Sequence, residues 1–205
     1  GLNLLSPYEF FNIHTSYNYL LKIIEKMNIL LPEINEKYKN TNQKLDCFMK
    51  EYQSVFQIDE LEKYSLTNMI TTVFQKGIYN DLDILQNSID NGLKNIILFC
   101  EGLNKYIDPK KQGCIKRDNN EKYGYYLYVT DNRAKTFQNS VKHLANTIVK
   151  IGDYTIDLKD IQFIKRGGNT HLEFPILSGI TNKYSSDRLK IQGINKDYFQ
   201  KQCDE

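Results

Sequence analysis

Long apolar runs are missing from this chain of 205 residues, of which 40% are hydrophobic and 25% are charged. The longest candidate is the segment 95–100, whereas a helix that crosses a bilayer needs about 20 predominantly apolar residues. The sequence therefore excludes a membrane-spanning helix. Residues 1–5 show neither the basic region nor the cleavage site of a signal peptide. Because Gly1 stands in place of an initiator Met, we expect a tag remnant or an excised piece of a longer protein.

Cysteine and histidine are scarce, and neither is arranged as a metal or catalytic site. The four cysteines are far apart and form no C-x-x-C pair, which indicates reduced thiols in an intracellular, reducing compartment. The three histidines stand apart from any cysteine or paired carboxylate. We interpret His14 and His143 as ordinary helix residues and His171 as a surface residue of a hairpin.

Catalytic motifs are absent as well. The sequence has no phosphate-binding loop, no dinucleotide-binding glycine pattern, no zinc-protease helix and no nucleophile elbow. Asp81 and Asp83 are two positions apart, so on a helix they point to different faces and suit the positive end of the helix dipole. We predict that this chain is not an enzyme, that it holds no cofactor or metal, and that it neither binds nor hydrolyses ATP.

Charge is distributed unevenly along the chain, although the formal net charge is only +2. Residues 1–108 contain 10 Lys and Arg against 14 Asp and Glu, whereas residues 109–205 contain 17 against 11. A basic second half indicates a module that meets an anion such as nucleic acid or a membrane surface.

The first half is predicted to be helical. Ser6, Pro7 and Glu9 form a capping-box signal with proline at the first helical position. Apolar residues at spacings of three and four continue this helix until Pro32. A second helix with a polar middle follows to about residue 56, and a long third helix begins near residue 80 and extends to about residue 106.

After Asp108-Pro109 the pattern changes to short β-rich runs. We expect a first hairpin with strands at 113–117 and 123–130 around a turn at 118–121, a helix at 132–150, a second hairpin with strands at 161–164 and 171–174, and helices at 176–189 and from 195 onward. The predicted fold class is α+β, with a mainly helical module at residues 2–108 followed by a small mixed α/β module with β-hairpins at residues 109–205.

The turn at residues 165–170 is the best local candidate for binding phosphate. Positive side chains at the tip of a β-ribbon reach phosphates, and glycines let backbone amides approach closely. The alternative is a solvated turn whose charge serves solubility. The candidate contacts are Lys165 and Arg166, supported by Asn169 and Thr170 as neutral donors, followed by Lys116 and Arg117, which the neighbouring hairpin is expected to present on the same side.

Four tyrosines in one predicted strand suggest base stacking. Alternation places Tyr126 and Tyr128 on one face and Tyr123 and Tyr125 on the other, so core packing takes at least one of the two pairs. We favour structural tyrosines, because no basic-aromatic pattern of an RNA-recognition strand accompanies them.

Three segments carry a resemblance to a known family. They are L-S-P-Y-E-F at 5–10, F-Q-K-G-I-Y-N-D-L-D-I-L at 74–85 and K-Y-G-Y-Y-L-Y-V-T at 122–130. In this order they resemble the middle of MutS-type DNA mismatch-recognition proteins, whose lever helix begins with a pattern like I-x-x-G-x-x-x-E-L-D-x-L-R and whose clamp carries G-Y-Y-I-E-V-T. Leu82 and Asp83 match the lever pattern, whereas Asp81 and Gln86 replace its Glu and Arg. The helix at 132–150 is atypical of bacterial members, and the chain looks more like the divergent branch of giant DNA viruses and octocoral mitochondria.

The resemblance implies a lever-and-clamp fragment whose partner is duplex DNA. It implies that the clamp grips the DNA backbone non-specifically through the six candidate contacts, that the fragment is a monomer, and that the parent is a dimer using ATP and Mg. The implied compartment is the host cytoplasm for a viral protein, or the mitochondrion. Two alternatives are a protein-interaction module with a solvated basic surface and a non-catalytic RNA-binding accessory domain. No membrane partner is expected.

Overall fold

The computed structural model describes residues 5–120 and 124–204, and it confirms an α+β fold. Within these residues, no helix has both the length and the apolar character of a membrane span. The chain forms two compact units, of which the first comprises Gly1–Gln86 with Leu189–Glu205 and the second comprises Asn87–Arg188. Asp108, the boundary inferred from the sequence, lies within the second unit. Whether the chain also divides there as a folding boundary stays a prediction.

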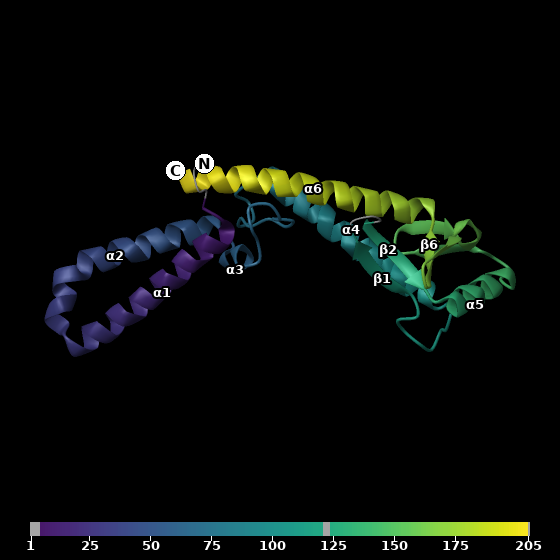
Figure 1. The fold of residues 1–205 in the computed structure, drawn as a ribbon, viewed down its shortest axis with the longest axis horizontal. Helices are drawn as coiled ribbons and strands as arrows, with labels where there is room; N and C mark the ends of the chain where they lie inside the picture. Colours follow the sequence, from purple (N-terminus) through teal and green to yellow (C-terminus); the bar gives the residue numbers. More distant parts are fainter. Residues whose placement is uncertain (1–4, 121–123, 205) are drawn as a thin grey trace. The chain divides into compact units, whose positions relative to one another are not determined.

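The first unit begins with a helical hairpin of α1 (Pro7–Leu30) and α2 (Pro32–Val55), which lie side by side in Figure 1. The predicted capping box is confirmed: the Ser6 hydroxyl accepts the backbone N–H of Glu9, and the Glu9 carboxylate accepts the backbone N–H of Ser6. Pro32 follows Leu31, whose conformation is not helical, so the chain turns between the two helices at the predicted place.

Helix α1 carries apolar residues on two faces. One face packs against α2, where His14 is buried and Phe10 and Tyr17 make ring contacts with α2 residues. The other face leaves large apolar side chains exposed at helical spacing, namely Leu20, Ile23, Met27 and Leu30. The sequence pattern alone does not distinguish these two faces, because both recur every three or four residues.

The core of the first unit draws on both ends of the chain. A short helix α3 (Ile58–Leu61) buries Leu61, and the rings of Phe56 and Phe74 pack 5.1 Å apart. Phe199, from the helix α6 (Pro175–Asp204), packs on Phe56 with ring centroids 5.6 Å apart. The Asn195 side chain donates to the backbone oxygens of Met69 and Thr71, which fixes the segment between α3 and α4. The first unit is therefore assembled from segments more than a hundred residues apart.

The start of α4 (Asn80–Asn104) explains the lever-like motif in local terms. Gly77 has a φ of +92°, a conformation that favours glycine, and its N–H donates to Asp83 Oδ2 at 2.8 Å. Leu82 is buried in the core. The helix begins where the sequence predicted and ends at Asn104, close to the expected residue 106.

The second unit is built on a four-stranded antiparallel sheet in the order β1-β2-β6-β5. The strands are β1 (Lys116–Asn120), β2 (Gly124–Val129), β5 (Gln162–Arg166) and β6 (Asn169–Glu173). On one face Leu127 and Leu172, which are paired neighbours, join a core with Phe99 of α4 and Phe137 of α5 (Asp131–Lys142). Both predicted hairpins are confirmed, but Asp118 to Asn120 lie in β1, so the predicted turn at 118–121 is wrong, and the connection itself falls at 121–123, outside the described residues.

The helix predicted at 132–150 is too long. Helix α5 ends at Lys142, and the following residues form a second hairpin of β3 (Ile148–Ile151) and β4 (Tyr154–Asp157), followed by the 3-10 turn η1 (Leu158–Asp160). Gly152, at a φ of +57°, makes the turn between the two strands. The mainly β-branched segment 147–151, followed by Gly-Asp, is typical of a hairpin. Its apolar residues also fit helical spacing, and for this reason the sequence predicted a longer helix.

Helix α6 is one continuous element of 30 residues, whereas the sequence suggested two helices. Gly193 lies within it and has no neighbouring atom within 4 Å of where a side chain would begin. Ile191 and Asn195, two residues before and after this glycine, are buried. Their packing holds the helix together, so Gly193 does not interrupt it.

Candidate nucleic-acid interface

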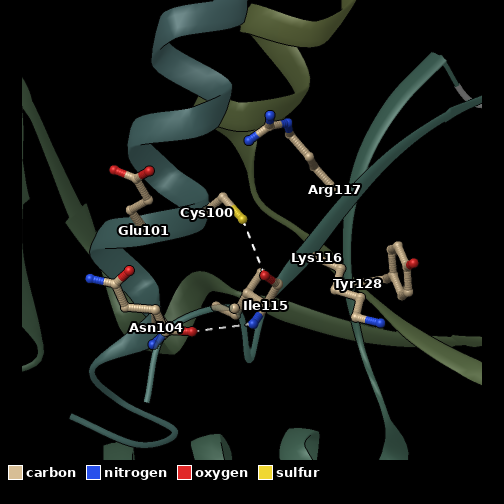
Figure 2. A pocket seen from close by; sticks show the side chains of 9 residues that line it. Cys100, Glu101, Asn104, Ile115, Lys116, Arg117 and Tyr128 are labelled. Carbon is tan, nitrogen blue, oxygen red and sulfur yellow. Dashed lines mark hydrogen bonds between the residues drawn. The ribbon is translucent and has the colours of Figure 1, made fainter. Parts of the chain in front are cut away.

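A pocket of about 560 Å³ opens between the edge strand β1 and helix α4 (Figure 2). Its wall includes Cys100, Glu101 and Asn104 from α4, Ile115, Lys116 and Arg117 from the chain entering β1, and Tyr128 from β2. In Figure 2 the Arg117 side chain extends towards α4 above Cys100, and Lys116 lies on the side of Tyr128. This arrangement follows from strand geometry, because consecutive side chains point to opposite faces.

Asn104 fixes the segment that leads into β1. Its Oδ1 accepts the N–H groups of Cys114 and Ile115 at 2.7 and 3.3 Å, and its Nδ2 donates to the Lys111 oxygen. Arg133 also donates to the Cys114 oxygen at 3.1 Å. Asn104 is itself buried. Lys116 and Arg117 therefore extend from a backbone that is held in place before any ligand arrives.

The pocket holds one thiol, and its environment makes it unreactive. Cys100 Sγ donates to the Ile115 oxygen at 3.3 Å. Burial raises the pKa of the Cys100 thiol, although Arg117 opposes this by favouring the thiolate. The thiol therefore stays protonated at neutral pH, and the pocket offers cations to an anion and no nucleophile.

The hairpin tip carries cations that are already paired with carboxylates. The tip is the two-residue turn Gly167-Gly168, with a φ of +60° at Gly167. Lys165 Nζ lies 2.7 Å from Asp131, and Arg166 lies 2.6 Å from Glu173. The Lys165 hydrogen bond is the main cause that lowers the pKa of Asp131, followed by that of Thr170.

The six residues singled out in the sequence do not form one surface. Lys116 and Arg117 lie on β1 and Lys165 and Arg166 on β5, which are opposite edges of the sheet, three strand spacings or roughly 14 Å apart. Strand pairing puts Lys116 and Arg166 on one face of the sheet and Arg117 and Lys165 on the other, and the expectation that the neighbouring hairpin presents its cations on the same side as the tip stays a prediction. Thr170 is 6% exposed and donates its hydroxyl to Asp131, and Asn169 is half-buried at the start of β6.

The tyrosines of β2 divide as alternation predicted. Tyr125 packs against Tyr184 of α6 with ring centroids 5.0 Å apart, whereas Tyr126 and Tyr128 lie on the opposite face. His171 is buried there beneath Tyr126, so its interpretation as a surface residue is wrong, since β6 is a central strand. Tyr123 lies outside the described residues. The spacing of two between Tyr126 and Tyr128 is the sequence pattern that predicts their common face.

The other titratable residues have structural surroundings. His14 is hydrogen-bonded to Tyr52 and Asn18, and His143 ends α5 at the surface. The four cysteines are free thiols. In the described part of the chain, no group of three or more His, Cys, Asp or Glu side chains is placed to hold a metal ion. Lys183 is hydrogen-bonded to Ser88 and forms an ion pair with Asp187.

Comparison with known proteins adds no relative: the chain matches no protein-family model, and no curated protein matches it. Function is therefore inferred from the geometry of the second unit and from the motif resemblance.

Proposed function

We propose that the chain is the lever-and-clamp part of a MutS-type DNA mismatch-recognition protein, whose second unit grips the backbone of duplex DNA. The observation that carries this proposal is the pair Lys116 and Arg117, which are consecutive, exposed and in the wall of one open pocket. The second unit holds 16 Lys and Arg against 11 Asp and Glu, a net charge of +5. Contacts to phosphate supply affinity and orientation without reading sequence.

The edge position of β1 suits backbone contact. Lys116 and Arg117 point to opposite faces, so together they flank a phosphate chain that runs along the strand edge. An edge strand also turns a row of backbone N–H groups away from its sheet, and these groups are donors for phosphate oxygens. Because Asn104 fixes the preceding segment, the backbone loses little conformational entropy when DNA binds.

The hairpin tip contributes secondary contacts in this proposal. The Lys165 side chain is 70% exposed and its pair with Asp131 lies at the surface. Exposed ion pairs contribute little to stability because water and salt screen them, so a DNA phosphate competes with Asp131 for Lys165. Arg166, whose side chain is 28% exposed and paired with Glu173, is a weaker candidate contact, and Asn169 stays a candidate neutral donor. We leave Thr170 out of the interface, because its hydroxyl is buried and engaged.

The motif positions give the family assignment local support. Gly77 precedes the long helix α4, in whose first turn Leu82 and Asp83 lie, and the G-Y-Y-x-x-V residues form the central strand β2, which Thr130 follows. On this proposal the mismatch reader, the ATP and Mg site and the dimer contacts belong to other parts of the parent. This chain itself is a monomer without catalytic activity.

The test is duplex binding by fluorescence anisotropy at low salt, because non-specific DNA affinities lie near 10⁻⁴ to 10⁻⁶ M at physiological salt. We expect Lys116→Ala/Arg117→Ala to weaken binding and to reduce the slope of log affinity against log salt by about 0.9 for each lost contact. The matched control is Lys22→Ala/Lys26→Ala on the exposed surface of α1, which removes the same charge from the first unit.

Two results would contradict the proposal. One is an unchanged affinity and slope in the Lys116→Ala/Arg117→Ala variant. The other is a strong preference of the wild-type chain for a mismatched duplex, because the proposal assigns that discrimination to another part of the parent.

A further inference from the structure

The face of the four-stranded sheet that points away from the core carries aromatic rings on its two central strands. Tyr126 and Tyr128 come from β2 and His171 from β6. Tyr126 lies parallel to His171, with ring centroids 4.3 Å apart and 8° between their planes, and Tyr128 lies 5.9 Å from Tyr126. Both tyrosines are half-buried, so the sheet supports their rings without enclosing them.

One cross-strand row joins these rings to the proposed duplex site. Strand pairing places Lys116 opposite Tyr128, Tyr128 opposite His171, and His171 opposite Ile164. The backbone of an exposed edge lysine therefore lies one strand spacing, about 4.8 Å, from the backbone of Tyr128. Lys116 and Tyr128 also line the pocket described above, so that pocket leads onto this face.

Two acidic groups on the described part of this face are engaged with neighbours. Glu173 is paired with Arg166, and Asp118 accepts the Tyr126 hydroxyl at 3.3 Å. Lys116 is the exposed cation of the row. The face therefore combines ring surfaces with a positive edge, which suits a ligand that alternates planar bases and phosphates.

A second, smaller pocket of about 290 Å³ lies at the far end of the ring series. Tyr126, Arg166 and His171 line it together with Ser178 and Asn182 from the first turns of α6. The rings of this pocket can stack on the face of a nucleobase, and its hydroxyl and amide groups can form hydrogen bonds with the polar edge of the same base.

We propose that this face is a stacking platform for an unpaired stretch of single-stranded DNA. Bases stack on Tyr128 and Tyr126, the phosphate beside them contacts Lys116, and the small pocket takes a base edge. This inference rests on the proposed function, because Lys116 serves both the duplex backbone and the platform. Stacking tolerates any base, so the platform detects the absence of pairing and not the base sequence.

The test uses the full chain with an oligo-dT probe that contains one 2-aminopurine, whose fluorescence falls when the base stacks on a ring. We expect Tyr126→Leu and Tyr128→Leu each to weaken single-strand binding by about tenfold and to remove the quenching. Tyr126→Phe and Tyr128→Phe should retain both, because they keep the ring. Tyr19→Leu, which removes an exposed tyrosine from α1, is the matched control and should behave like the wild type.

The outcomes separate this inference from the proposed function. If duplex binding responds to Lys116→Ala/Arg117→Ala while the leucine variants still bind and quench the probe normally, the platform is overturned and the duplex site stands. If the phenylalanine variants fail as the leucine variants do while thermal unfolding is unchanged, stacking is overturned too. Tighter binding of oligo-rU than oligo-dT would overturn the assignment to DNA. Absence of both duplex and single-strand binding at low salt would overturn both proposals.

Discussion

Lys165 and Asp131 form an ion pair with Nζ and Oδ2 2.7 Å apart, and the other oxygen of the same carboxylate accepts the Thr170 hydroxyl at 2.8 Å. One side chain in the first turn of α5 thus holds the end of β5 and the start of β6. Both hydrogen bonds lower the pKa of Asp131, so its charge opposes that of Lys165 throughout the neutral range. The hairpin tip is therefore less positive than its sequence indicates.

Removing this carboxylate should strengthen duplex binding. In Asp131→Asn, Lys165 loses its ion-pair partner, so we expect tighter binding at low salt and a slope against log salt that is steeper by about 0.9. Anisotropy titrations across a salt series provide the measurement. Asp160→Asn makes the same change of charge at another exposed position of the second unit. An equal gain in that control would show an effect of net charge and not of Lys165.

Stability should fall as the pH drops below about 6.5, the ordinary histidine pKa. Burial is the main cause that lowers the pKa of both His14 and His171; Asp59 partly opposes it at His14, whereas Arg166 lowers the pKa of His171 further. A lowered folded-state pKa means that the unfolded chain binds the proton first, so the stabilisation is present above about pH 6.5 and is lost as the pH falls through the folded value. Urea midpoints at pH 7.5 and 5.5 should differ less in His14→Gln/His171→Gln than in the wild type. An equal difference in the double variant and in the wild type would contradict this prediction.

Two glycines should respond to alanine with opposite signs. Gly152 has a φ of +57°, and a side-chain carbon there would lie 2.4 Å from Leu98 Cδ2, so Gly152→Ala should cost at least roughly 1–2 kcal/mol. Gly179 lies within α6 in open space, so Gly179→Ala should stabilise the chain by roughly 0.5–1 kcal/mol. Denaturant unfolding of both variants measures the contrast. A loss of stability in Gly179→Ala would contradict the conformation described for α6.

Asn104 should protect the connection between α4 and β1 from proteolysis. Asn104→Ala leaves the buried N–H groups of Cys114 and Ile115 without their acceptor, at roughly 1–3 kcal/mol for each unpaired group. We predict that dilute trypsin first cuts the wild-type chain near residues 106–112, and that this variant accelerates the cut. Asn139→Ala, on the exposed side of α5, should leave the cleavage rate unchanged. First cleavage within α4 would contradict the prediction.

The sequence predicted best where local chemistry decides the structure. The capping box at Ser6, the start of α4 and the Gly167-Gly168 turn all follow from the residues at those positions. It failed where tertiary packing decides. Residues 143–150 have apolar spacings that fit a helix, yet Ile151 packs into the core as part of a strand.

The candidate site was less predictable than the fold. Lys116 and Lys165 were identified as basic residues of hairpins, but their separation depends on the strand order, which the sequence pattern leaves open. Asn104 carries no motif signal, because its role depends on three backbone groups that follow it along the chain. The sequence predicted an exposed His171, but Tyr126 stacks on its ring, and this contact depends on the pairing of β2 with β6, which the sequence pattern leaves open.

The discontinuity of the first unit has a consequence for the order in which the protein folds during synthesis. Residues 87–188 form an uninterrupted unit, so a nascent chain can complete it as soon as Arg188 has left the ribosome. The first unit cannot close until Ile191, Asn195 and Phe199 emerge, because these buried residues complete its core. Residues 5–86 therefore complete their core only after residues 87–188 have been synthesised, and Met69 and Phe74 stay exposed until then.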